Sequence, residues 1–219
     1  MSRYWGLMVL AFLMSACSYR DAKRQLQEMK LHKGVLVGIK VLYPFDGTLF
    51  PPEFYPPTFS WADTGNATAR QWYVFIHDTA VTKFYIKDKV SSSSWRPDSM
   101  EWEKIKRLPA KNFVFTVMSY SSITKTYVGG QVRFAFSNDS VGADIFFRAV
   151  TLPFSFAVKN VHTIEWYLGS VKGGRPRLML KDMPVCGNCH SFPAGGKPIL
   201  AMDVDYGNDK GSYTIAEID

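Results

Sequence analysis

Two short runs of residues constrain the fold of this chain most strongly. Residues 72–76 read Trp-Tyr-Val-Phe-Ile, and residues 113–117 read Phe-Val-Phe-Thr-Val. Aromatic and β-branched side chains favour strands, and neither run is long enough for a helix. From Val35 onward similar runs alternate with turn residues, a spacing typical of a β-sandwich. The predicted strands are Leu36–Leu42, Pro57–Trp61, Gln71–His77, Lys83–Ile86, Asn112–Tyr120 and Tyr127–Phe136.

The order of signals within residues 35–138 favours one kind of sandwich. A proline-rich entry precedes Phe59-Ser60-Trp61, and residues 108–113 lead into the later long strand. This order resembles that of a fibronectin type III domain over residues 42–138. The resemblance implies that Trp61 lies in the core, with stacking on a ligand as the alternative. Met100–Leu108 is expected to form a short helical turn that Pro109 ends.

The N-terminus predicts export. Arg3 precedes the apolar run Trp5–Met14, which is too short to span a bilayer and suits a signal peptide covering residues 1–16. Residues 13–17, Leu-Met-Ser-Ala-Cys, resemble a bacterial lipobox, although Met14 stands where leucine is usual. The resemblance implies lipidation of Cys17. Because Ser18 follows it, the same resemblance favours the outer over the inner membrane. An ordinary signal peptide cut near Ala16 is the alternative.

Residues 17–33 are polar with few apolar positions, and we expect a weak helix or a lipid-anchored tether there rather than a core element. The chain carries a formal net charge of +7, and the basic residues are densest in this segment. They could contact anionic headgroups next to the anchor. No basic motif of a nucleic-acid-binding domain is present, so nucleic acid is not expected as a partner.

Residues 186–190, Cys-Gly-Asn-Cys-His, are the most specific chemical signal in the chain. A c-type haem is bound by two thioethers and by the histidine that follows the second cysteine. Cys186 and Cys189 therefore predict covalent haem c, and His190 predicts the proximal iron ligand. Haem attachment takes place after export, which agrees with the signal peptide predicted for residues 1–16.

Other functions for the same residues stay open. In an exported protein, Cys186 and Cys189 could form a structural disulfide. Zinc would need two further ligands, and no second Cys-x-x-Cys is present. A thioredoxin-like pair would need a βαβ context, which the flanking residues lack. For the distal iron position Met202 is the first candidate, and the others are Met179, Met183 and His162.

The residues after the motif predict a β-hairpin within residues 186–219. Residues 191–197 resemble the Ser-Phe-x-x-x-Gly-Lys segment that opens a blade of a TolB-like β-propeller. In this chain proline and glycine replace the acidic residue that is usual in the turn of that segment. Over residues 35–219 the chain also resembles exported bacterial proteins that join a sandwich, a Cys-x-x-Cys-His-Ser-Phe segment and such a propeller. That resemblance implies that the sequence stops within the first blade. Residues 139–185 are expected to be an extended linker.

Together these features predict a mainly β protein of the cell envelope that faces the periplasm. We expect a c-type haem protein for electron transfer or redox sensing, held at the membrane by its lipid and working with a redox or envelope protein. No Gly-x-Ser-x-Gly or His-Glu-x-x-His motif is present, which favours an electron carrier or binding module over an enzyme. The alternative is a non-catalytic envelope scaffold in which the cysteine pair is a disulfide.

Overall fold

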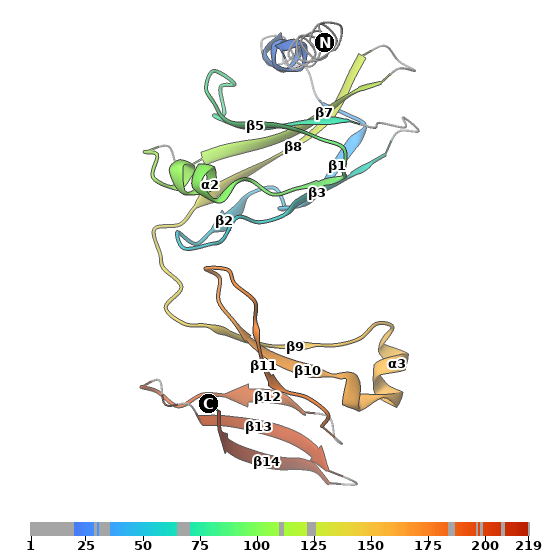
Figure 1. Ribbon diagram of the computed structural model, residues 1–219, viewed down its shortest axis with the longest axis vertical. Helices are drawn as coiled ribbons and strands as arrows, with labels where there is room; N and C mark the ends of the chain where they lie inside the picture. The colour runs from blue at the N-terminus through green and yellow to red at the C-terminus, as the bar shows by residue number, and fades with distance from the viewer. Residues whose placement is uncertain are drawn as a thin grey trace, which may run out of the picture. The chain divides into compact units, whose positions relative to one another are not determined.

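The computed structural model is mainly β and divides into two units, residues 1–140 and residues 141–219 (Figure 1). The structure describes residues 20–28, 30, 36–64, 71–109, 112–121, 126–183, 187–195, 197, 199–206 and 209–218. No helix in these ranges is long and apolar enough to cross a membrane.

The first unit contains two sheets. One has the strand order β1-β3-β6, and the other has the order β2-β8-β7-β4-β5. Neighbouring strands are antiparallel except β2 and β8, which run parallel. The strands are β1 (Ile39–Tyr43), β2 (Thr48–Phe50), β3 (Phe59–Asp63), β4 (Trp72–His77), β5 (Phe84–Val90), β6 (Ser94–Trp95), β7 (Asn112–Ser121) and β8 (Thr126–Phe136). All six predicted strands are confirmed, whereas β2 and β6 are too short to leave a pattern in the sequence.

Aromatic side chains from both sheets form a single core in this unit. The rings of Phe59 on β3 and Phe115 on β7 lie 4.4 Å apart, between their centroids. Trp61 is buried beside Phe115 and Trp72, so its interpretation as a core residue is confirmed. Offset and edge-to-face rings of this kind contribute beyond their buried area.

The helix α2 (Ser99–Lys106) closes one end of this core. Asp98 caps its first turn by accepting hydrogen bonds from the backbone N–H groups of Met100 and Glu101. Trp102 is fully buried, and its indole N–H donates to the carbonyl of Phe54 at 2.9 Å. The predicted helical turn is therefore confirmed within two residues of its expected ends.

The segment expected to be a weak helix or a tether is in part a packed helix. Residues 20–28 are helical, and Ala22 and Leu26 are buried in a cluster with Phe75 and Met118. Gln27 also donates to the carbonyl of Val81. A weak helix was one of the two alternatives expected for this segment, so the helix is confirmed and only its burial was unexpected. Two apolar positions one helical turn apart are enough to dock a short helix on a sheet. Cys17 itself lies outside the described residues.

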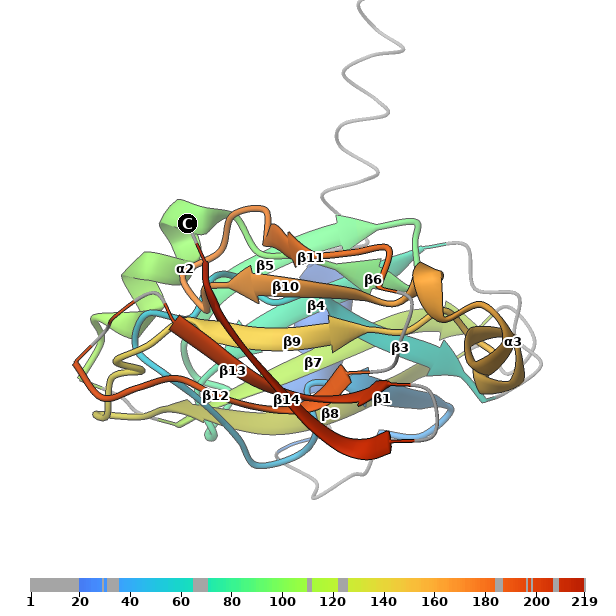
Figure 2. The ribbon, with the colours of Figure 1, turned by 90° about the horizontal axis from the view of Figure 1, so that it is seen from below.

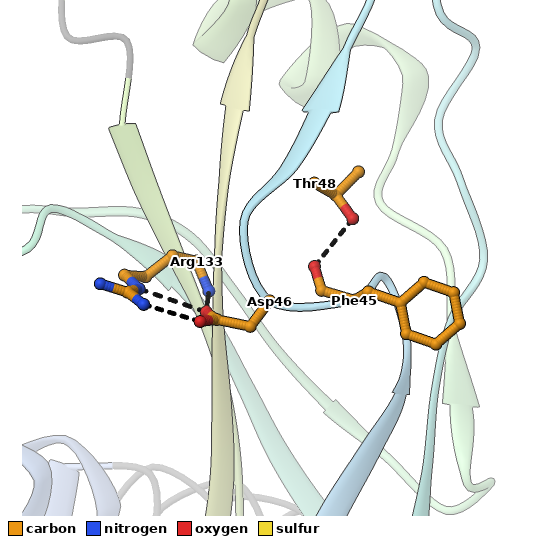
Figure 3. Close-up of polar contacts among 4 residues, drawn as sticks. All are labelled: Phe45, Asp46, Thr48 and Arg133. Carbon is orange, nitrogen blue, oxygen red and sulfur yellow. Dashed lines mark hydrogen bonds and ion pairs between the residues drawn. The ribbon is translucent and has the colours of Figure 1, made fainter.

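The turn between β1 and β2 is held by an ion pair (Figure 3). Asp46 accepts from the backbone N–H of Arg133 at 2.8 Å and from two nitrogens of its guanidinium, at 3.2 and 2.7 Å. The Arg133 side chain lowers the pKa of Asp46 to about 2. Both side chains are more than half exposed, so solvent screens the pair.

His77 on β4 is a buried histidine with both ring nitrogens in hydrogen bonds. Its Nδ1 lies 2.6 Å from the carbonyl oxygen of Asp78, which only accepts, and Nε2 lies 2.8 Å from the hydroxyl of Thr116. Nδ1 therefore carries a proton, and in the neutral ring Nε2 accepts from the Thr116 hydroxyl. Desolvation lowers the pKa of His77.

The second unit corrects the prediction of an extended linker at residues 139–185. Residues 145–180 form a three-stranded antiparallel sheet, β11-β10-β9, with helix α3 (Phe154–Lys159) and a 3₁₀ turn, Val161–Thr163, between β9 and β10. Its strands are β9 (Ile145–Ala149), β10 (Glu165–Gly169) and β11 (Arg177–Leu180). The apolar pieces were recognised, but their pairing is a non-local property that local composition does not reveal.

A second antiparallel sheet, β12-β13-β14, completes this unit (Figure 2). The predicted hairpin is confirmed as β13 (Ile199–Tyr206) and β14 (Asp209–Glu217), and β12 (Gly187–Ser191) pairs with β13. One buried cluster joins the two sheets through Phe146 and Trp166 on one side and Leu200, Met202 and Val204 on the other. The alternation of these β13 positions places all three on the same face.

We predict that Asp46→Asn lowers the free energy of unfolding by the contribution that the charged Asp46 carboxylate makes in wild type. Because the pKa of Asp46 is lower in the folded than in the unfolded chain, this contribution is present above pH 3.8 and disappears as the pH approaches about 2. Screening limits it to at most about 1 kcal/mol. Urea unfolding at several pH values measures it. Asp46→Ala, which also removes the acceptor for the Arg133 N–H, should cost more; equal losses would contradict this assignment.

We also predict that His77 makes the first unit less stable in mild acid. The unfolded chain binds the proton more tightly than the folded one between the lowered pKa and 6.5, so the unfolding free energy rises with pH across that window. Urea titrations of wild type and His77→Gln should show this slope in wild type only. His162→Gln, an exposed histidine in the other unit, is the control and should leave it unchanged.

Candidate functional site

The motif residues that the structure describes lie on an edge strand. Gly187–Ser191 forms β12, which pairs with β13 on one side only. Cys189 and His190 are both exposed, and Cys189 forms no disulfide with any residue that the structure describes. Cys186 lies outside the described residues, so the disulfide alternative is untested. A haem-attachment segment needs two accessible thiols and an accessible imidazole, and the described part of this edge presents one of the thiols, Cys189, and the imidazole of His190.

A β-bulge shapes this strand. Gly187 pairs with Val204 and His190 with Met202, so three steps along β12 match two along β13. Asn188 and Cys189 therefore lie together opposite Asp203. The bulge brings Gly187 and His190 to the same face of the sheet, the face that carries Met202 and Val204. It also relaxes the strict alternation that would otherwise direct Cys189 and His190 to opposite faces.

Aromatic rings surround the His190 imidazole. Its centroid lies 4.8 Å from Phe146 of β9 and 6.1 Å from Phe192, which follows β12. Phe146 and Phe192 lie 5.6 Å apart, and all three pairs meet edge to face. These contacts orient the imidazole, and the residue is exposed.

Two hydrogen-bond donors lie beside the same strand. The Arg148 guanidinium donates from Nη1 to the carbonyl of Gly187 at 3.1 Å. Trp166 is buried, and for its indole N–H the described residues offer no acceptor. Its ring edge lies near Gly187, where an added Cβ would be 3.4 Å from Cζ2 of Trp166. The indole N–H groups of Trp61 and Trp72 in the core of the first unit likewise have no acceptor among the described residues, so this state is not particular to the motif.

The structure also explains the glycine of the motif. A Cβ at position 187 would lie 2.6 Å from the sulfur of Met202, well inside van der Waals contact. Met202 is buried and fills the space above Gly187. Glycine therefore lets β12 approach the core closely.

The position of Met202 bears on its predicted role as distal ligand. Met202 and His190 are directly opposed on adjacent strands, where Cβ atoms are about 4.5–5.5 Å apart and point the same way. A distal ligand must approach iron from the other side of the porphyrin. This register disfavours Met202, which serves as a core residue here. Met179 and Met183 pack against the same cluster, and the distal ligand stays a prediction.

Sequence reasoning missed Phe146, Arg148 and Trp166 as parts of this site. They belong to strands some twenty to forty residues before the motif, and only the packing of the two sheets brings them to it. Within the described ranges, no three His, Cys, Asp or Glu side chains are grouped as a metal ion would require. Comparisons with protein-family models, curated proteins and solved structures found no match.

We predict that Gly187→Ala destabilises the second unit by about 1–3 kcal/mol, because the new methyl group displaces the Met202 sulfur. The shorter side chain of Met202→Val should reduce that cost in the double variant. Urea unfolding of the four proteins measures the coupling. Gly211 is in the same sheet and has open space around it, so Gly211→Ala is the matched control and should leave the free energy of unfolding unchanged. Additive losses would contradict the overlap.

Proposed function

We propose that this protein binds haem c covalently through Cys186 and Cys189, with His190 as the proximal iron ligand, and that it transfers or senses electrons. The observation that carries the proposal is that the Cys189 thiol and the His190 imidazole are both exposed on one edge strand, with the imidazole against the edges of Phe146 and Phe192. Bound haem would supply a one-electron redox centre.

The surroundings of β12 are chemically suited to such a group. Phe192 is exposed and offers apolar surface for a porphyrin. The exposed Arg148 is a donor suited to a propionate carboxylate. The role of the chain is then to orient the imidazole, to cover one side of the group and to neutralise its acidic edge.

The proposal extends to location and architecture. Lipidation of Cys17 would anchor the protein in a membrane of the cell envelope, with the folded chain facing the periplasm. The outer membrane is favoured over the inner one. In the first unit, two sheets that share a core containing Trp61 support a fibronectin type III-like sandwich. In the second, the antiparallel β12-β13-β14 sheet supports a propeller-like blade. The expected partner is a redox or envelope protein.

The test is expression of the full chain with export and a haem-attachment system. We expect a Soret band, bands that shift on reduction, and a mass increase of one haem. Cys186→Ser with Cys189→Ser should abolish covalent attachment, whereas Ser191→Ala, on the same strand, should retain it. A chain without haem whose mass is lower by two hydrogens would overturn the proposal and support the disulfide-closed scaffold.

A further inference from the structure

Helix α3 and the residues before it expose large apolar side chains. The exposed fractions are 71% for Leu152, 67% for Phe154, 45% for Phe156 and 75% for Val158. Within α3, which the structure describes in full, Ala157 is the buried residue that attaches the helix to the core. Phe154 and Val158 lie one helical turn apart on the same face of α3, and we call these two residues the α3 patch.

The α3 patch continues into an apolar hollow of about 200 Å³. Phe154 and Val158 line this hollow together with Val150, Val161 and Ile164. Contiguous exposed apolar surface of this kind marks a binding face in soluble domains.

Charges around the α3 patch specify what it contacts. Arg148 lines the hollow, and Lys159 follows Val158 directly. Residues 145–164 contain no Asp or Glu. The next acid, Glu165, accepts from the hydroxyl of Tyr167 and alternates with the buried Trp166, so it lies on the opposite face of β10 from the core. Apolar residues that protrude between cations match a bilayer with anionic headgroups.

We propose that the α3 patch docks on the surface of a membrane that contains anionic phospholipid. Pairing with a second copy fits less well, because a symmetric interface would bring Arg148 and Lys159 near their own copies. The contact uses a different element from the cysteine motif, and Arg148 is the one residue that it shares with the proposed haem site.

Tryptophan fluorescence in vesicles tests this contact. The full chain is reconstituted in vesicles of phosphatidylethanolamine and phosphatidylglycerol with acyl chains brominated near the headgroups. Phe154→Trp is compared with Tyr213→Trp, an equally conservative change at a 77% exposed position of β14, after subtraction of the native signal. The fluorescence of the indole introduced by Phe154→Trp should be quenched about threefold more than that of the indole introduced by Tyr213→Trp. The reason is that a docked α3 patch would place its side chains about 5–10 Å below the headgroup boundary, close to the bromine atoms.

Two further samples complete the test. Val158→Asp added to Phe154→Trp should abolish the extra quenching while circular dichroism stays unchanged, and vesicles of phosphatidylcholine alone should weaken it. Equal quenching at the two positions would overturn the proposal. So would a blue shift of the Phe154→Trp signal that needs no lipid and grows with protein concentration, which would assign the α3 patch to a second copy.

Discussion

The contact of Met202 with Gly187 and Trp166 fixes the position of the candidate site. Met202 lies in the middle of β13, and its sulfur occupies the space that any side chain at position 187 would need. Because Trp166 packs on the same spot from the other sheet, β12 is held against the core at its first residue. The bulge follows this fixed point and presents Cys189 and His190 at the edge. The exposure of these two residues is therefore a consequence of packing.

The two units meet different physical demands. The first unit buries a dense set of aromatic rings, and its buried histidine, His77, has both nitrogens satisfied. Such a unit is suited to be a stable scaffold. The second unit has a smaller core and keeps reactive and apolar groups at its surface, including His190 and the α3 patch. Exposed groups of that kind stabilise a fold little, which favours a role in binding.

The two proposals use separate surfaces of the second unit and one shared residue. Arg148 donates to the backbone of the motif and also lines the hollow beside α3. A haem at β12 and a membrane at α3 would thus be adjacent along β9, through Phe146, Arg148 and Val150. Together they describe an electron carrier held close to the bilayer.

The sequence by itself determined the six longer strands of the first unit, the core position of Trp61, the C-terminal hairpin and the candidate motif, because each depends on residues close together in the chain. Periodicity and turn residues act locally. Only the tertiary structure decided that residues 139–185 form a sheet, that residues 20–28 pack as a helix, and that Phe146, Arg148 and Trp166 reach the motif. Those outcomes depend on strand pairing and burial between distant segments, and a local pattern carries no information about which segments will meet.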